Sequence, residues 1–137
     1  MVTEEKSAGV ILYRLDNDKV FFLLLKYEAG HWGFPKGHIE QKESEIETLT
    51  RELAEETGIE DIEVVDAFRK TIEYFFKRGN KSVHKEVVYY LARTSQKDVV
   101  LSHEHVDYAW LEFDDAMERL TFKNSKNLLM AASDFLK

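Results

Sequence analysis

The order of the predicted elements indicates an α/β sandwich. Segments rich in β-forming residues occupy both halves of the chain, one helix is expected between them at residues 44–58, and another closes the chain at residues 125–136. A length of 137 residues fits one hydrophobic core, so we expect residues 1–137 to form a single domain.

The first half is expected to begin with a β-hairpin. Residues 7–14 and 20–27 are apolar runs typical of strands, and residues 16–18 (Asp-Asn-Asp) between them favour a turn. Residues 30–37 contain three glycines and the only proline of the chain, which predicts a loop of tightly set geometry.

The second half is expected to contribute further strands and two helices. Asp114 is expected to cap a short helix that runs through Leu120. Residues 78–81 (Arg-Gly-Asn-Lys) predict a turn, and residues 101–105 a polar loop. The segments that favour strands are residues 62–68, 70–76, 86–92 and 108–111. The terminal helix carries one apolar side, made of Leu128, Leu129, Ala132, Phe135 and Leu136.

The central helix has clear boundaries. Ser44 is a favourable N-cap, Glu47 three residues later completes a capping box, and Gly58 stands where a left-handed C-terminal cap is usual. The residues that form its apolar stripe at helical spacing are Ile46, Leu49 and Leu53.

Three carboxylates gather on a neighbouring face of this helix, at Glu52, Glu55 and Glu56. Like charges one turn apart destabilise an isolated helix. A hard divalent cation would turn this repulsion into attraction, because Mg²⁺ favours carboxylate oxygens. The alternative is a solvated acidic surface.

The whole segment from Gly37 to Ile59 fits Gly-x5-Glu-x7-Arg-Glu-U-x-Glu-Glu-x-Gly-U, where U is apolar. This pattern resembles the Nudix box, the signature of Nudix hydrolases. The resemblance implies an α/β/α sandwich with a mixed central sheet. It also implies a loop–helix–loop that binds Mg²⁺ or Mn²⁺ and cleaves a nucleoside diphosphate linked to another group.

The resemblance assigns roles within the box. It implies metal ligation by Glu52, Glu55, Glu56 and the carbonyl of Gly37. Arg51 would orient a catalytic glutamate, so Arg51 and Glu55 are candidate catalytic residues.

Glu43 would pair with Arg51 by the same resemblance. The alternative is that Arg51 pairs with Glu47 along the helix. Two positions depart from the usual pattern: Lys42 replaces a glycine, and Leu49 stands where a small residue is common.

Three further segments, residues 32–38, 85–92 and 101–111, resemble the asymmetrical diadenosine tetraphosphate hydrolases within this family. The most discriminating part is Leu-Ser-His-Glu-His at residues 101–105. By this resemblance Glu104 is a further metal ligand or the general base; otherwise it is a surface residue.

The same resemblance implies that Lys36 and Lys85 contact phosphates. His31 and His38 are either hydrogen-bond donors to phosphate or parts of the loop structure.

Aromatic residues supply candidates for base stacking. Tyr89 matches an adenine-stacking tyrosine, but core packing of its strand is an equal alternative, and for Tyr90 core packing is favoured. Tyr74 is a weaker stacking candidate.

Composition limits the function classes. A net charge of −7 argues against broad binding to nucleic acid polymers, and we expect no stable nucleic acid partner. The chain has no cysteine, no apolar run long enough to span a membrane and no signal-peptide pattern, so the expected location is the cytoplasm. We also expect a monomer.

The resemblance to asymmetrical diadenosine tetraphosphate hydrolases implies metal-dependent hydrolysis of diadenosine tetraphosphate to ATP and AMP. The alternatives within the class are 5′ ends of RNA, nucleoside triphosphates and diphosphoinositol phosphates. An alternative outside it is a nucleotide-sensing Nudix module without turnover.

Overall fold

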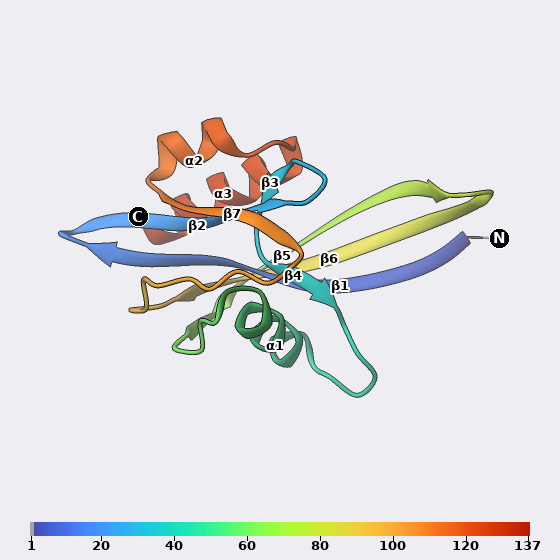
Figure 1. The fold of residues 1–137 in the computed structure, drawn as a ribbon, viewed down its shortest axis with the longest axis horizontal. Helices are drawn as coiled ribbons and strands as arrows, with labels where there is room; N and C mark the ends of the chain where they lie inside the picture. The colour runs from blue at the N-terminus through green and yellow to red at the C-terminus, as the bar shows by residue number, and fades with distance from the viewer. Residues whose placement is uncertain (1) are drawn as a thin grey trace.

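The computed structural model describes residues 2–137, apart from the side chain of Asp66. In this range seven strands form one mixed sheet, with α1 on one face and α2 and α3 on the other (Figure 1). The predicted α/β/α sandwich is confirmed. The strands are β1 (Val2–Asp16), β2 (Lys19–Tyr27), β3 (Trp32–Gly33), β4 (Lys36–His38), β5 (Glu63–Arg78), β6 (Lys81–Arg93) and β7 (His105–Leu111). The helices are α1 (Glu45–Thr57), α2 (Phe113–Arg119) and α3 (Lys123–Leu136).

Strand β1 is the centre of the sheet. It pairs in parallel with β6, and the order of the main path is β3-β2-β1-β6-β5. On its other side β1 pairs antiparallel with two partners in turn, β4 at residues 7–9 and β2 at residues 13–16. Between these stretches Val10 N–H donates to the Pro35 carbonyl at 3.0 Å, which brings the loop before α1 onto the middle of the sheet.

Two hydrophobic cores lie on opposite faces of the sheet, because side chains alternate along each strand. In β6, Tyr89 belongs to the core beneath α2 and α3, and Val88 to the core beneath α1. Leu49 and Leu53 of α1 are 1% and 0% exposed, so the predicted apolar stripe does attach this helix to the sheet.

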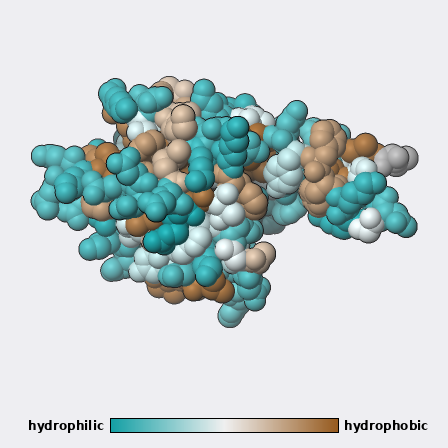
Figure 2. All heavy atoms as spheres, turned by 90° about the horizontal axis from the view of Figure 1, so that it is seen from above, coloured by the Kyte–Doolittle hydropathy of each residue, from teal (hydrophilic) through white to brown (hydrophobic). Residues whose placement is uncertain are grey.

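The start of β1 and the β5–β6 hairpin project beyond the helices as a three-stranded arm (Figure 1). Figure 2 shows polar and apolar side chains mixed on the surface of this arm. Phe75 is 69% exposed there. Tyr74, its neighbour, points to the other face and lines a cavity of the main body.

Helix α1 has the predicted ends. Ser44 and Glu47 form the capping box, and Gly58 has a left-handed φ of 74°. These contacts join residues only a few positions apart, so local sequence was sufficient to predict them.

Several other expectations were wrong in detail. The loop expected at residues 30–37 contains the short strands β3 and β4. The segments 62–68 and 70–76 join into one strand, β5, with an irregular register between Val65 and Arg69. Glu112 rather than Asp114 occupies the N-cap position of α2.

The terminal helix and Tyr90 also differ from expectation. Helix α3 begins at Lys123 rather than Ser125, and Phe135 is 43% exposed although it contacts Phe68 edge-to-face. Tyr90 is only half-buried, because its hydroxyl reaches Glu45 and donates a hydrogen bond of 2.8 Å to that carboxylate.

Candidate active site

Arg51 of α1 organises the carboxylates around it. Its Nε donates to Glu43 Oε2 at 2.7 Å and its Nη2 to Glu43 Oε1 at 3.0 Å, a bidentate pair. Its Nη1 lies 3.0 Å from Glu52 Oε1 and 3.4 Å from Glu55 Oε2. The Arg51 guanidinium lowers the pKa of Glu43 to about 2. The alternative pairing of Arg51 with Glu47 is wrong, because Glu47 is engaged in the capping box.

The loop before α1 accommodates the departure at position 42. Lys42 adopts a left-handed φ of 71°, a conformation that costs a non-glycine residue about 1–2 kcal/mol. This explains why glycine would suit the position. The loop is nevertheless held by Glu43, whose Oε1 accepts from Glu40 N–H at 3.0 Å and from the Thr48 hydroxyl at 2.8 Å.

An acidic cleft of about 740 Å³ lies beside α1 and β4. It brings Glu104 together with the three carboxylates of α1, although about 50 residues separate them in sequence. The predicted residues that line it are Lys36, Gly37, His38, Arg51, Glu52, Glu55, Glu56, Lys85 and Glu104.

Glu56 is the most buried carboxylate of the acidic cleft, at 3% exposure, and its Oε1 has no hydrogen-bond partner among the described residues. Burial raises its pKa to about 9, and the Glu52 and Glu104 carboxylates add to this effect. A buried anionic oxygen without a partner is costly unless a positive charge compensates it.

Glu52 lies against Gly37. A Cβ at position 37 would stand 1.9 Å from Glu52 Cδ, so only glycine leaves room for this carboxylate. As they stand, no three His, Asp or Glu side chains of residues 2–137 are arranged to hold a metal ion. Glu52 and Glu55 are both within reach of Arg51, and joint coordination would require them to turn into the cleft.

Glu104 lies in a turn that backbone hydrogen bonds attach to neighbouring elements. Ser102 N–H donates to the carbonyl of Glu56 at 3.2 Å, and Glu28 N–H donates to the carbonyl of Glu104 at 3.3 Å. The next residue, His105, is 5% exposed and packs edge-on against the Tyr27 ring at 4.6 Å. The Glu104 side chain itself remains exposed at the acidic cleft.

Positive charge enters the same cleft from β4 and β6. Lys85 is 7% exposed, and its Nζ lies 3.4 Å from His38 Nε2 and 3.7 Å from Glu5 Oε1. Burial lowers the pKa of both Lys85 and Lys36, and for Lys36 the nearby Lys85 adds to the effect. Two lysines held close to each other under partial burial favour an anion between them.

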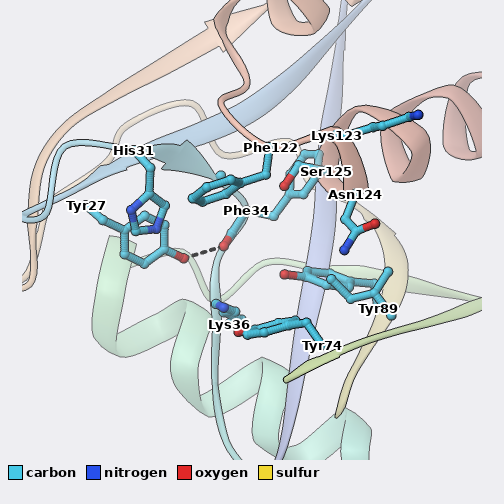
Figure 3. A pocket seen from close by; sticks show the side chains of 12 residues that line it. Tyr27, His31, Phe34, Lys36, Tyr74, Tyr89, Phe122, Lys123, Asn124 and Ser125 are labelled. Atoms are coloured by element: carbon cyan, nitrogen blue, oxygen red, sulfur yellow. Dashed lines mark hydrogen bonds between the residues drawn. The ribbon is translucent and has the colours of Figure 1, made fainter. Parts of the chain in front are cut away.

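Figure 3 shows an aromatic cavity of about 570 Å³. It adjoins the acidic cleft, because Tyr27 and Lys36 line both. It contains the other predicted substrate residues, Tyr74, Tyr89 and His31. Tyr89 fits both of its interpretations, since it is 4% exposed as a core residue and still lines this cavity. His31 stacks on Tyr27, with ring centroids 4.5 Å apart, and so lies apart from His38 in the acidic cleft.

Sequence reasoning missed several residues of the aromatic cavity. They come from β2, from the segment between β3 and β4, and from the N-cap and first turn of α3, and only the hydrophobic character of the three aromatic ones was visible in the sequence. The missed residues are Tyr27, Phe34, Phe122 and Asn124.

The fold and the loop–helix–loop define the class of this protein. A NUDIX domain model matches residues 4–132, and the chain belongs to the Nudix hydrolase family. Members of this family generally require divalent metal ions. Among the described residues, no helix is both long and apolar enough to cross a membrane.

Comparison with known proteins shows which members of the family this chain is similar to. The chain is 36% identical to the asymmetrical bis(5′-nucleosyl)-tetraphosphatase of Sus scrofa, over 96% of this chain and 95% of that protein. It is 37% identical to the protein of the same name from Caenorhabditis elegans, over 96% of each chain. The crystal structure of a C. elegans Ap4A hydrolase binary complex superposes with a TM-score of 0.85 at 35% identity, covering 96% of this chain and 97% of that one.

Proposed function

We propose that this protein hydrolyses diadenosine tetraphosphate to ATP and AMP, using Mg²⁺ or Mn²⁺. The observation that carries this proposal is the junction of the aromatic cavity with the acidic cleft: Tyr27 and Lys36 line both. A nucleoside can stack in the first while its phosphate chain continues into the second. The relatives named above act, by their names, on such dinucleoside tetraphosphates.

The carboxylates of the acidic cleft fit a divalent cation. No group in the described part of the chain hydrogen-bonds the buried Oε1 of Glu56, and Glu52 lines the same cleft next to Gly37. We assign metal ligation to Glu52, Glu55, Glu56 and the Gly37 carbonyl. Glu104 is assigned as a further ligand or as the general base. When bound, the cation would neutralise phosphate charge and lower the pKa of an attacking water.

Lys36, Lys85 and His38 would hold the phosphate chain. Burial lowers the pKa of both lysines, because it disfavours their charged forms. An anion beside them would stabilise the charged forms and would therefore bind strongly. His31 would donate to the phosphate nearest the nucleoside, at the edge of the aromatic cavity. The base would stack on Tyr74 and Tyr89, and such stacking contributes about 1–3 kcal/mol in single-strand binders.

Glu104 is our candidate for the general base. Its carboxylate is exposed at the acidic cleft while its backbone is bonded to Glu28, so it can accept a proton from a water that attacks phosphorus. Arg51 contacts both Glu52 and Glu55 through its guanidinium group and would orient them at the acidic cleft. As water attacks phosphorus, the P–O bond to the departing nucleotide breaks. The step needs no covalent intermediate with the protein.

Two rival functions predict different results. An enzyme acting on RNA 5′ ends or nucleoside triphosphates would prefer those substrates, whereas the net charge of −7 disfavours long RNA. A nucleotide sensor has no need of carboxylates in the cleft, yet Glu52, Glu55 and Glu56 all line it.

A nucleotide panel with and without Mg²⁺, with products separated by chromatography, tests the proposal. We expect equal amounts of ATP and AMP from diadenosine tetraphosphate, at a higher kcat/KM than for RNA 5′ ends or ATP. Two molecules of ADP would contradict asymmetrical cleavage, and binding without turnover would favour a sensor.

The monomeric state and cytoplasmic location belong to the proposal as well. The proposed location rests on the sequence, which has no cysteine and no long apolar run. Sedimentation of the purified protein and imaging of a tagged protein would check them.

A further inference from the structure

The walls of the aromatic cavity do not by themselves select a base. Tyr27, Phe34, Tyr74, Tyr89 and Phe122 present rings, and every nucleobase has a face that stacks on a ring. Discrimination between adenine and guanine therefore requires hydrogen-bonding groups aimed at the edge of the base.

Asn124 supplies such groups. It stands in the first turn of α3, and Figure 3 shows its amide directed into the aromatic cavity above the Tyr89 ring, while Lys123 extends away. The Asn124 side chain has no hydrogen bond among those of the described residues. Its donor and its acceptor are both free to meet a ligand.

The other polar groups of the aromatic cavity are less suited to this task. The Tyr27 hydroxyl donates to the Phe34 carbonyl at 2.5 Å and is thereby occupied. Lys36 stands at the junction with the acidic cleft, where phosphate is expected. Hydroxyls such as that of Ser125 rotate and offer no fixed donor–acceptor pair.

We propose that Asn124 is a specificity-determining residue that reads the edge of the base held in the aromatic cavity and favours adenine. This inference rests on the proposed function. Adenine presents its N6 amino donor beside a ring-nitrogen acceptor, a pattern that the carbonyl and amino groups of one asparagine match together. Guanine presents two neighbouring donors, N1–H and the N2 amino group, which a carboxylate matches better.

The substitution Asn124→Asp converts the donor–acceptor pair into two acceptors without changing size. An aspartate in the first turn of a helix is favourable, so the variant is expected to fold. The matched control is Asn127→Asp, which makes the same change at an exposed position of the same helix outside the aromatic cavity.

The test measures kcat/KM for diadenosine and diguanosine tetraphosphate with Mg²⁺. For Asn124→Asp we expect the adenine-to-guanine ratio of kcat/KM to fall about tenfold or more, as expected when one bidentate pair is exchanged. Asn124→Ala should lower the same ratio by weakening turnover of the adenine substrate, without a gain for guanine. Asn127→Asp should leave the ratio at its wild-type value.

Each outcome separates the two proposals. If the wild-type protein hydrolyses neither substrate, the proposed function fails. If it hydrolyses them and the ratio is the same in wild type, Asn124→Asp and Asn124→Ala, the role of Asn124 is refuted. An equal change in Asn127→Asp would also refute it, because the effect would then be one of helix charge.

Discussion

The carboxylate of Glu52 occupies the space that a side chain at Gly37 would need. The distance from an added Cβ to Glu52 Cδ would be 1.9 Å, far inside van der Waals contact. The absence of a side chain at position 37 is therefore a condition for the geometry of the acidic cleft.

Gly37→Ala is expected to displace Glu52 and to lower kcat about a hundredfold, since a shift of about 1 Å in a catalytic group has effects of that size. The Mg²⁺ concentration for half-maximal activity should rise. Gly33→Ala is the control, because a Cβ there would make an ordinary contact of 3.6 Å with Tyr27. A normal Mg²⁺ response in Gly37→Ala would show that Glu52 is not a ligand.

Glu56→Gln is expected to keep the fold and lose most activity, because it removes one charge from the carboxylate cluster without a change in volume. In differential scanning calorimetry, Mg²⁺ should raise the Tm of the wild type and have little effect on the variant. Turnover near the wild-type value at saturating Mg²⁺ would remove Glu56 from the proposed ligands.

The same variant changes the pH dependence of stability in the absence of metal. The pKa of Glu56 is raised by folding from 4.5 to about 9, so the folded state holds its proton more tightly. The wild type should therefore lose stability relative to Glu56→Gln as pH rises through this window. Urea unfolding at pH 5 and pH 9 would check this, with the exposed Glu60→Gln as a control that shows no such trend.

Glu104→Gln is expected to lower kcat by about 10²–10⁴-fold with little change in KM if Glu104 is the general base. The acidic limb of the pH–rate profile should then flatten. If Glu104 is a metal ligand, the variant should instead recover at high Mg²⁺. Unchanged kcat at low Mg²⁺ would exclude both roles.

Lys85→Ala is expected to raise KM, by a factor that grows with the number of phosphates in the substrate. The reason is that Lys85 is nearly buried at the acidic cleft, where its charge faces little screening. Steady-state kinetics with tri-, tetra- and pentaphosphates would measure this, with Lys81→Ala at the exposed tip of the arm as control. Equal losses on all chain lengths would make Lys85 structural.

Glu45→Gln is expected to lower the free energy of unfolding by about 1.5–3 kcal/mol, as is typical for hydrogen bonds to a charged group, because Glu45 attaches α1 to the sheet. Glu45 accepts from Arg69 at 2.8 and 3.0 Å and from Tyr90 at 2.8 Å, and Arg69 lowers its pKa to about 2. The stabilisation by the ionised Glu45 carboxylate is present above pH 4.5 and is lost as the pH falls toward 2. Urea unfolding at pH 7 and pH 3 should show the larger difference from wild type at pH 7; equal differences would disprove this charge effect.

Local sequence was sufficient to predict α1 and the gathering of three of its carboxylates on one face. The capping box joins Ser44 to Glu47, and the spacing of Glu52, Glu55 and Glu56 follows from the helical repeat alone. These features depend on interactions within one or two turns. The position of Glu104 in the site was predicted only through a family resemblance, and the structure places it at the acidic cleft through the bond from Ser102 to Glu56.

The tertiary structure decided what lies beside these carboxylates. Lys85 meets His38 across 47 positions, and Asn124 reaches the cavity of Tyr89 because α3 packs on the same face of the sheet. Such neighbours depend on strand order and register, and the short strand β4 that aligns Lys36 with the cleft had been expected as a loop. Residue types and local periodicity determine which groups can act, but pairing between distant strands determines which of them meet, because side chains on one face become neighbours only when the sheet has formed.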